Sequence, residues 1–432
     1  MVNLGSPYQG YLYAYPHKTA YRPLDPRPRL EDVWAGEDPA KLFLYVHVPY
    51  CEMRCGFCNL FTRANPPHEQ VTAYLAQLRR QTARTMAAIP GARFARAAIG
   101  GGTPTYLTAP ELTELFDLIE DGTGFERGPM SVETSPATAT PDRLKVLNER
   151  GATRISIGVQ SFLDAEAHAA GRPQHRPEVD RALDAIRAAG PAGLNIDLIY
   201  GIPGQTRATW DESLSTALRW APEELYLYPL YVRPMTGLGR RGKGADPQWD
   251  AQRLELYRHA VARLTAEGYE QRSMRQFRRP DGRPDTPDEY CCQDDGMLGL
   301  GCGARSYTRA LHYSFDYAVG VAHVRGILAD YLARPAADFD VAEVGFALDA
   351  AEQRRRWLLK SLLRAEGVDP AGYSARFGTS VDDDFPALAG LRDAGYAEGH
   401  RLTAEGLAHS DAIGPWLISA GVREAMAGHV TR

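Results

Sequence analysis

Three of the six cysteines of this chain lie in the short stretch "CEMRCGFC", at Cys51, Cys55 and Cys58. An odd set of thiols does not match a disulfide framework, and a structural zinc site normally closes four ligands around the metal. Thiolates are also the usual ligands of [4Fe–4S] clusters, and three of them leave one iron open to an amino and carboxylate ligand. The spacing therefore indicates such a cluster, with a zinc site completed by His47 or a remote cysteine as the alternative.

Polar or glycine-rich groups also mark the predicted β-strands that follow the cysteines. Gly100, Gly101 and Gly102 end one strand, and the next three end in or contain Glu133, Gln160 and Asp197. In an α/β barrel the carboxyl ends of the strands share one mouth, where functional residues gather. The glycines allow close approach of a ligand, and the polar side chains can hydrogen-bond an amine or ribose hydroxyls. A tight turn without a ligand is the alternative for the glycines.

These residues must be positioned by alternating strands and helices. Short apolar, β-branched runs predict strands at residues 42–48, 96–100, 130–134, 153–159, 195–201 and 224–230. Amphipathic stretches between them predict helices at residues 110–122, 178–190 and 209–221. This alternation is typical of βαβ units around a parallel sheet. Six units are too few for the usual eight-stranded barrel, so we expect an α/β fold with an open, partial (β/α)6 barrel.

The chain divides into three predicted segments. Residues 1–40 are rich in Tyr and Pro, and we expect them to fold over the barrel mouth as a lid that shields the site from solvent; a loose tail is the alternative. Residues 41–240 form the barrel. Residues 241–432 form a mostly helical domain, with a helix at 250–267, a loop-rich segment at 288–307 and a winged-helix-like element near the end.

Overall composition argues against several classes of function. The formal charge is −5, the pI is near 6.2, and the arginines are spread along the chain, so we expect no nucleic-acid or membrane-surface partner. No apolar run reaches the roughly 18 residues of a membrane span, and no secretory signal is visible. Six cysteines are too few for a disulfide framework, so we expect a cytoplasmic protein. We also expect a monomer that acts on a small molecule.

The motifs also carry a family resemblance. "CEMRCGFC" resembles the CxxxCxxC signature of radical S-adenosylmethionine (SAM) enzymes. From about residue 40 onward, the chain is similar to the HemN-like branch, which includes oxygen-independent coproporphyrinogen III oxidases, through "YVHVPYC", "GGGTPTYL", "RISIGVQSF" and "NIDLIYGIPGQT". The resemblance implies reductive cleavage of SAM to a 5′-deoxyadenosyl radical, with an electron donor such as flavodoxin or ferredoxin. The radical would serve oxidation of a porphyrinogen-type substrate or transfer of a methyl or methylene carbon.

Matching positions imply a set of SAM contacts: Tyr45, Phe57, Gly101, Gly102, Thr103, Glu133, Gln160, Arg172 and Asp197. Phe57 would lie against the adenine, and the catalytic residues implied are Tyr45, His47 and Arg172. Some HemN-like enzymes bind a second SAM near the positions of His47 and Gly101. The alternative for Arg172 and His175 is a solvated loop, and Tyr226, Tyr228 and Tyr231 are either site residues or core.

Three departures bear on the branch of the family. Leu60 stands where the similar coproporphyrinogen oxidases carry another cysteine. The haem-chaperone branch carries an HNxxYW motif where this chain has "DEYCCQDDGM", so we expect no stoichiometric haem, and we interpret Cys291, Cys292 and Cys302 as small buried groups. The tyrosine-rich N-terminus favours a ligand less anionic than a tetracarboxylate, so coproporphyrinogen III is expected to be a poor substrate. HemN-like C-methyltransferases and cyclopropanases form a third branch, and a non-catalytic haem chaperone is the alternative function.

Overall fold

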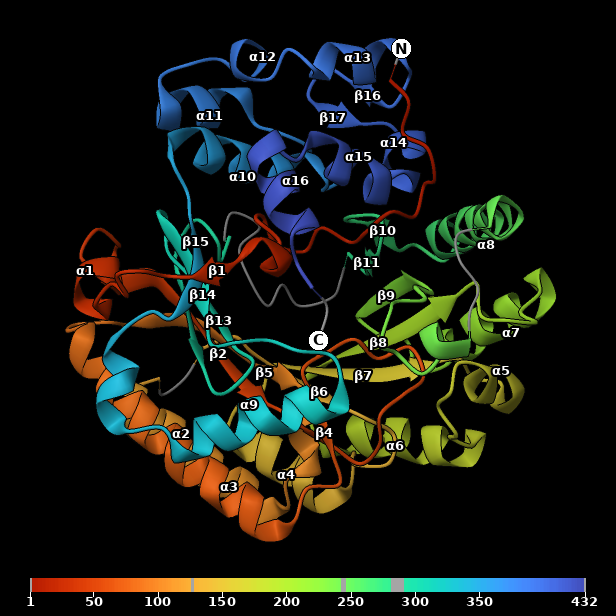
Figure 1. The fold of residues 1–432 in the computed structure, drawn as a ribbon. Helices are drawn as coiled ribbons and strands as arrows, with labels where there is room; N and C mark the ends of the chain where they lie inside the picture. Colours follow the sequence, from red (N-terminus) through yellow and green to blue (C-terminus); the bar gives the residue numbers. More distant parts are fainter. Residues whose placement is uncertain (1, 126–127, 242–245, 281–290, 431–432) are drawn as a thin grey trace.

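One large sheet runs through the molecule (Figure 1), and the computed structural model describes residues 2–125, 128–241, 246–280 and 291–430. Six adjacent, parallel strands follow chain order: β2 (Leu42–Val48), β5 (Phe94–Gly101), β6 (Met130–Thr134), β7 (Arg154–Gln160), β8 (Gly193–Tyr200) and β9 (Glu224–Pro229). The helices of these units are α2 (His68–Ala88), α3 (Ala109–Thr123), α4 (Pro141–Glu149), α5 (Asp164–Ala169), α6 (Arg176–Ala189) and α7 (Arg207–Leu218). The open (β/α)6 arrangement expected from the sequence is confirmed.

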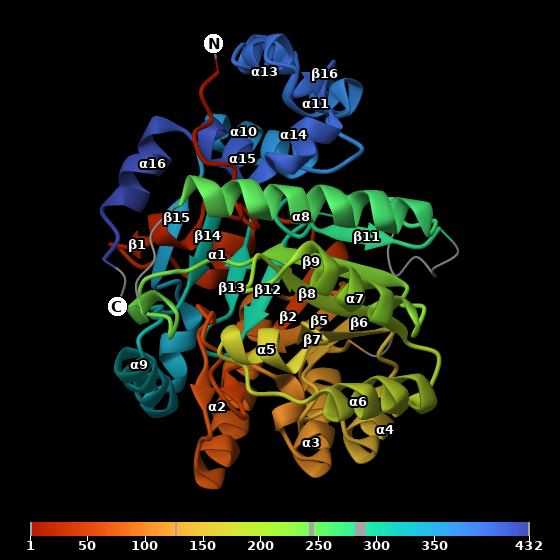
Figure 2. The same ribbon diagram turned by 90° about the vertical axis from the view of Figure 1, so that its right-hand side faces the viewer.

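The two-residue period of the strands separates the core from the site. On β2, Leu44 and Val46 are fully buried on the outer face, which the helices cover (Figure 2), whereas Tyr45 and His47 lie on the inner face. The same alternation places Glu133, Ser156, Asp197 and Tyr226 on inner positions of their strands. Because successive side chains point to opposite faces, the polar residues of five strands share one interior.

The sheet continues beyond the six parallel strands. β12 (Met297–Leu300) pairs in parallel with β2, and antiparallel strands follow it: β13 (Arg305–Tyr307), β14 (Leu311–Ser314), β15 (Val344–Ala347) and β1 (Arg22–Pro23). At the other edge β11 (Gln276–Arg278) pairs with β9, and β10 (Glu270–Gln271) pairs with β11. The segment 288–307, predicted to be loop-rich, thus contains the short strands β12 and β13. These strands are only three or four residues long, so they lack the longer pattern that would predict them, and residues 288–290 lie outside the described part.

The helical C-terminal region has its own core. α8 (Pro247–Ala266) and α9 (Val321–Ala333) pack into the barrel core, and the helices of the separate core are α10 (Ala350–Leu362), α11 (Pro370–Phe377), α12 (Val381–Asp384), α13 (Leu388–Asp393), α14 (Ala404–Ala408), α15 (Ser410–Leu417) and α16 (Ala420–Ala427). A short hairpin of β16 (Ala397–Glu398) and β17 (Arg401–Leu402) forms the expected wing. The N-terminal residues Leu4, Leu12 and Tyr15 pack into this core, so the first segment is tied to the last one. Among the described helices, none is both long and apolar enough to span a membrane.

Candidate active site

The three clustered cysteines lie on the loop that follows β2. Cys51 belongs to the short strand β3 (Tyr50–Cys51), which pairs with β4 (Arg63–Ala64), and its Sγ is 3.4 Å from the Thr103 hydroxyl. All three thiols are free. Burial raises the pKa of Cys51 and of Cys55, and the charge of Cys58 acts in the same direction on both. Three unbridged thiols close enough to influence one another are a donor set that fits an iron–sulfur cluster.

A second feature is how tightly this loop is held. The Gly56 N–H donates to the Gly171 carbonyl at 3.0 Å, and the Gly56 carbonyl accepts from the Leu238 N–H at 2.7 Å. A Cβ at Gly56 would lie 2.8 Å from the Ala170 carbonyl oxygen. The loop is thus clamped between segments that follow β7 and β9, and only glycine fits there.

The glycine run makes room for protein atoms. A Cβ at Gly100 would lie 2.9 Å from the Glu133 carboxyl carbon, and one at Gly101 would lie 2.8 Å from the His47 ring. A Cβ at Gly102 would approach Cys51 Sγ to 2.9 Å, and Gly101 has a φ of +120°. The glycines are therefore needed to bring Glu133, His47 and the cysteine loop together, and contact with SAM stays a prediction.

His47 is a buried, neutral group on the inner face of β2. Its Nε2 lies 3.2 Å from the Phe61 carbonyl oxygen and its Nδ1 lies 3.2 Å from the Tyr45 hydroxyl. A carbonyl oxygen only accepts, so Nε2 carries the proton and Nδ1 accepts from Tyr45. Burial lowers the pKa of His47 to about 4, and the charges of Arg305 and Lys18 act in the same direction. At neutral pH this histidine is an uncharged acceptor.

Two carboxyl groups lie on the inner face of the sheet, one on β6 and one on β8. Glu133 on β6 accepts from the Gly101 N–H at 3.2 Å, and Asp197 on β8 accepts from the Asn195 amide at 2.7 Å. Burial raises the pKa of Glu133 to about 7 and that of Asp197 to about 6, and repulsion from Asp197 also raises that of Glu133. The positive charge of Arg154 lowers both pKa values and so opposes these shifts. Glu133 keeps access to solvent although protein surrounds it, as expected for a side chain facing the barrel interior. A cationic amine placed here would hold both groups ionised.

Arg172 connects the end of β7 with the cysteines. Its side chain is buried, its Nε donates to the Gln174 amide oxygen at 2.7 Å, and its Nη1 lies 3.7 Å from Cys55 Sγ. Gln160 is also buried, has a φ of +70°, and would be 2.7 Å from a Cβ at Gly158. The solvated-loop alternative is therefore wrong for Arg172, whereas the neighbouring His175 is exposed and pairs with a surface aspartate.

The remaining predicted residues lie around the same interior. Phe57 packs against an apolar cluster at the ends of β8 and β9 formed by Ala170, Ile199, Ile202 and Leu230. Tyr226 and Tyr228 stack with ring centres 6.0 Å apart, and Tyr11 of the N-terminal segment lies 6.4 Å from Tyr228. Tyr231 instead donates to Asp411 of the helical region. The N-terminal segment thus contacts the strand ends, although its role as a lid stays a prediction.

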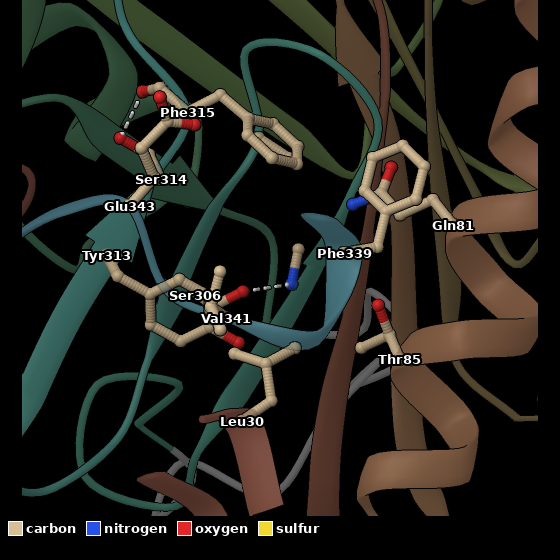
Figure 3. Close-up of a pocket in the computed structure, with 12 residues that line it drawn as sticks. Leu30, Gln81, Thr85, Ser306, Tyr313, Ser314, Phe315, Phe339, Val341 and Glu343 are labelled. Atoms are coloured by element: carbon tan, nitrogen blue, oxygen red, sulfur yellow. Dashed lines mark hydrogen bonds between the residues drawn. The ribbon is translucent and has the colours of Figure 1, made fainter. Parts of the chain in front are cut away.

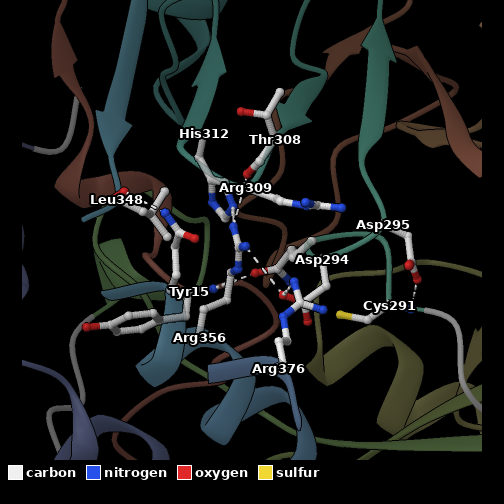
Figure 4. A network of polar contacts seen from close by, with 12 residues as sticks. Tyr15, Cys291, Asp294, Asp295, Thr308, Arg309, His312, Leu348, Arg356 and Arg376 are labelled. Atoms are coloured by element: carbon white, nitrogen blue, oxygen red, sulfur yellow. Dashed lines mark hydrogen bonds and ion pairs between the residues drawn. The ribbon is translucent and has the colours of Figure 1, made fainter. Parts of the chain in front are cut away.

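The cysteines near residue 300 lie in the core or beside a polar network. Cys302 is fully buried in the core. Cys291 lies beside a polar network in which Arg356 pairs with Asp294 at 3.3 Å (Figure 4), and burial raises its pKa to about 12. Leu60, which stands where the similar coproporphyrinogen oxidases carry another cysteine, is 48% exposed. The burial of Cys302 agrees with its interpretation as a small buried group, whereas Cys291 and Cys292 are only partly buried.

Sequence reasoning missed two cations of the interior, Lys18 and Arg305. They come from the N-terminal segment and from β13, and no motif joins them; a lysine among only five in the chain was the one available signal.

A separate cavity of about 30 Å³ lies between α2 and strands β12 to β14 (Figure 3), lined by Gln81, Thr85 and Ser306 among others. It has room for one or two water molecules, so it is no substrate site.

Comparison with known proteins agrees with this geometry. Residues 45–217 match the family described as the radical SAM superfamily. The chain is 27% identical over 383 residues to the heme chaperone HemW of Bacillus subtilis, covering 87% of this chain and 95% of that protein. It is 32% identical over 272 residues to the oxygen-independent coproporphyrinogen III oxidase of Paracoccus denitrificans, covering 62% of this chain but only 60% of that protein.

A solved structure shares the fold over nearly the whole chain. The coproporphyrinogen III oxidase HemN of Escherichia coli, described as a radical SAM enzyme, superposes with a TM-score of 0.80 at 24% identity, over 94% of this chain and 96% of that one. The matching superfamily, the relatives and this shared fold agree with the three-cysteine loop and the open barrel. Residues 45–217 therefore form a radical SAM domain, and the chain resembles HemN-like proteins over most of its length.

Proposed function

We propose that this protein reductively cleaves SAM at a [4Fe–4S] cluster held by Cys51, Cys55 and Cys58, and uses the 5′-deoxyadenosyl radical on a small-molecule substrate. The observation that carries the proposal is the convergence of three free thiols, a carboxyl pair and a buried arginine on one barrel interior. A bound cluster would supply the electron for cleavage of the sulfonium bond.

Each neighbouring side chain has a role that its contacts support. Glu133 and Asp197 accept hydrogen bonds from the amine or ribose of SAM, because both carboxyls face the interior beside the glycine run. Arg172 donates toward Cys55 Sγ and so stabilises negative charge on a thiolate. His47 stays neutral and orients the Tyr45 hydroxyl, and Phe57 offers an apolar surface for the adenine.

The substrate is proposed to be of porphyrinogen type and to undergo oxidation, because the coproporphyrinogen oxidases are among the relatives. Carbon transfer to a substrate is the other enzymatic outcome, and no comparison supports it over oxidation. We further propose a cytoplasmic monomer that receives electrons from a flavodoxin or ferredoxin.

A second candidate is a non-catalytic haem chaperone. The observation that favours it is the alignment with HemW, which spans 95% of that protein, whereas the alignment with the Paracoccus oxidase spans 60%. Titration with haem, followed by mapping of any attachment site, distinguishes the two candidates. The chaperone predicts one haem per chain, and the enzyme predicts none.

The experiment for the main proposal is anaerobic reconstitution followed by reduction with SAM. The wild type should hold about four irons and release 5′-deoxyadenosine. The triple variant Cys51→Ala, Cys55→Ala, Cys58→Ala should lose the iron and the release of 5′-deoxyadenosine. The matched control Cys302→Ala should keep the iron, because that thiol is buried in the hydrophobic core. Stoichiometric zinc without iron in the wild type would refute the proposal.

A further inference from the structure

Lys18 brings a positive charge from the N-terminal segment to the side of the cysteine loop. Its Nζ lies 3.3 Å from the centre of the Tyr317 ring, and the Tyr317 hydroxyl donates to the Asn59 carbonyl at 2.5 Å. Burial lowers the pKa of Lys18 well below its usual range, the charge of Arg305 lowers it further, and Cys58 acts in the opposite direction. His17, the neighbour of Lys18, lies 5.4 Å from the Tyr13 ring, which Arg305 also contacts, and Asn59 directly follows Cys58, so Lys18 lies near a second cation and beside the cysteine loop.

Arg305 is that second cation. Its Nε donates to the Tyr307 hydroxyl at 3.1 Å, and its guanidinium carbon lies 5.1 Å from the centre of the Tyr13 ring. Its charge lowers the pKa of both His47 and Tyr45, so it lies near the inner face of β2. His17 lies in the same field: burial lowers its pKa to about 3, and Lys18 and Arg305 act in the same direction.

Neither cation has a carboxylate partner within the described part of the chain. Four other enclosed arginines have one each: Arg154 with Glu224, Arg253 with Asp250, Arg275 with Asp411, and Arg356 with Asp294. Enclosing a charge without a counter-ion is costly, and two like charges side by side are costlier. The aromatic rings around Lys18 and Arg305 offset part of this cost but supply no negative charge.

We propose that Lys18 and Arg305 form a carboxylate clamp that binds an acidic group of the substrate. This inference rests on the proposed function and gives the N-terminal segment a direct part in substrate choice. The guanidinium can bind both carboxylate oxygens while the ammonium adds a point charge. The clamp departs from our expectation of a less anionic ligand, because the same tyrosine-rich segment carries Lys18.

The position of the clamp fits a substrate that lies opposite SAM. Tyr45 is influenced by Glu133, which raises its pKa, and by Arg305, which lowers it, after the larger effect of burial. In the sheet, β2 with Tyr45 lies two strands from β6, which carries Glu133, and two strands from β13, which carries Arg305, so one side is acidic, suited to the amine of SAM, and the other is basic, suited to a carboxylate. The interior is polarised in a way that keeps a cationic cofactor and an anionic substrate apart.

The test compares coproporphyrin III with its tetramethyl ester, which keeps the ring and removes the negative charges. Both are titrated into anaerobically reconstituted protein, with binding followed by fluorescence. We expect the wild type to prefer the free acid, and Lys18→Met and Arg305→Met each to bind it roughly tenfold more weakly, with little change for the ester. Arg305→Lys should recover part of the loss. Lys145→Met, on the exposed surface of α4, is the matched control.

Further measurements separate this proposal from its competitors. In the ligand-free protein Lys18→Met should not lower the denaturation midpoint, because it removes an unpaired charge, whereas Arg154→Met should lower it. Acid binding unchanged in both Met variants would refute the clamp. A loss of SAM affinity with unchanged porphyrin binding would assign the pair to the carboxylate of SAM and overturn the substrate role. A wild type that prefers the acid but releases no 5′-deoxyadenosine would refute the proposed function and leave the clamp standing.

Discussion

The ion pair between Arg275 and Asp411 should be a main support of the helical region against the barrel. Arg275 follows β10, Asp411 lies on α15, and their side chains are 4% and 2% exposed. Asp411 also accepts from the Tyr231 hydroxyl, and its carbonyl accepts from the Gly10 N–H at 3.1 Å. The Asp411 carboxylate therefore joins the barrel to the helical region, and the Asp411 backbone carbonyl holds the N-terminal segment. We predict that Asp411→Ala destabilises the whole arrangement.

The expected magnitude follows from burial. Removing one partner of a buried pair leaves the other charge uncompensated, at a cost of about 3–5 kcal/mol. The Arg275 guanidinium would keep the Tyr11 ring at 3.8 Å, the Tyr228 ring at 6.0 Å and the Met274 sulfur at 3.8 Å, and none of these carries a negative charge. An exposed pair between the same two regions, Arg258 with Glu405, is 54% and 47% exposed, and its loss should cost no more than about 1 kcal/mol.

The assay is denaturant unfolding of Asp411→Ala, Arg275→Met and the double variant, with Glu405→Ala as the matched control. Replacing Arg275 by an apolar residue in the Asp411→Ala protein should restore stability, because the uncompensated charge is gone. The reasoning is refuted if Asp411→Ala costs no more than Glu405→Ala, or if the double variant is less stable than Asp411→Ala alone.

Three further predictions concern the site. Gly102→Ala should reduce the iron bound after reconstitution, because its Cβ would press on Cys51 Sγ, whereas Gly36→Ala, with open space around it, should not; iron analysis checks both. SAM affinity should fall as pH drops through about 7, where Glu133 gains a proton and ceases to attract the amine, and calorimetry on Glu133→Gln should show this dependence flattened. Arg172→Met should shift the reduction potential of the reconstituted cluster to more negative values in a spectroelectrochemical titration, because a positive charge beside Cys55 is lost; an unchanged potential would contradict that role.

Much of the barrel could be predicted because its signals are local. Strands at 42–48 and 130–134 were predicted with the bounds that the structure has, since buried strands of parallel sheets are short, apolar and β-branched. The same two-residue period that buries Val46 turns His47 inward, so the inner position of the site residues was contained in the alternation itself. The cysteine spacing likewise lies within one loop and needs no tertiary information.

What the tertiary structure decided is which distant groups meet. The short strand β12 joins the sheet because β2 offers it a free edge, and β13 then pairs with β12. No local sequence pattern marks that edge. The glycine run proved to accommodate His47 and Glu133, contacts between strands that spacing along the chain does not reveal. The N-terminal segment with Lys18 packs into the C-terminal core while β13 with Arg305 extends the sheet, and the Tyr13 ring links the two. Local periodicity determines which way a side chain points, but long-range packing determines what it faces.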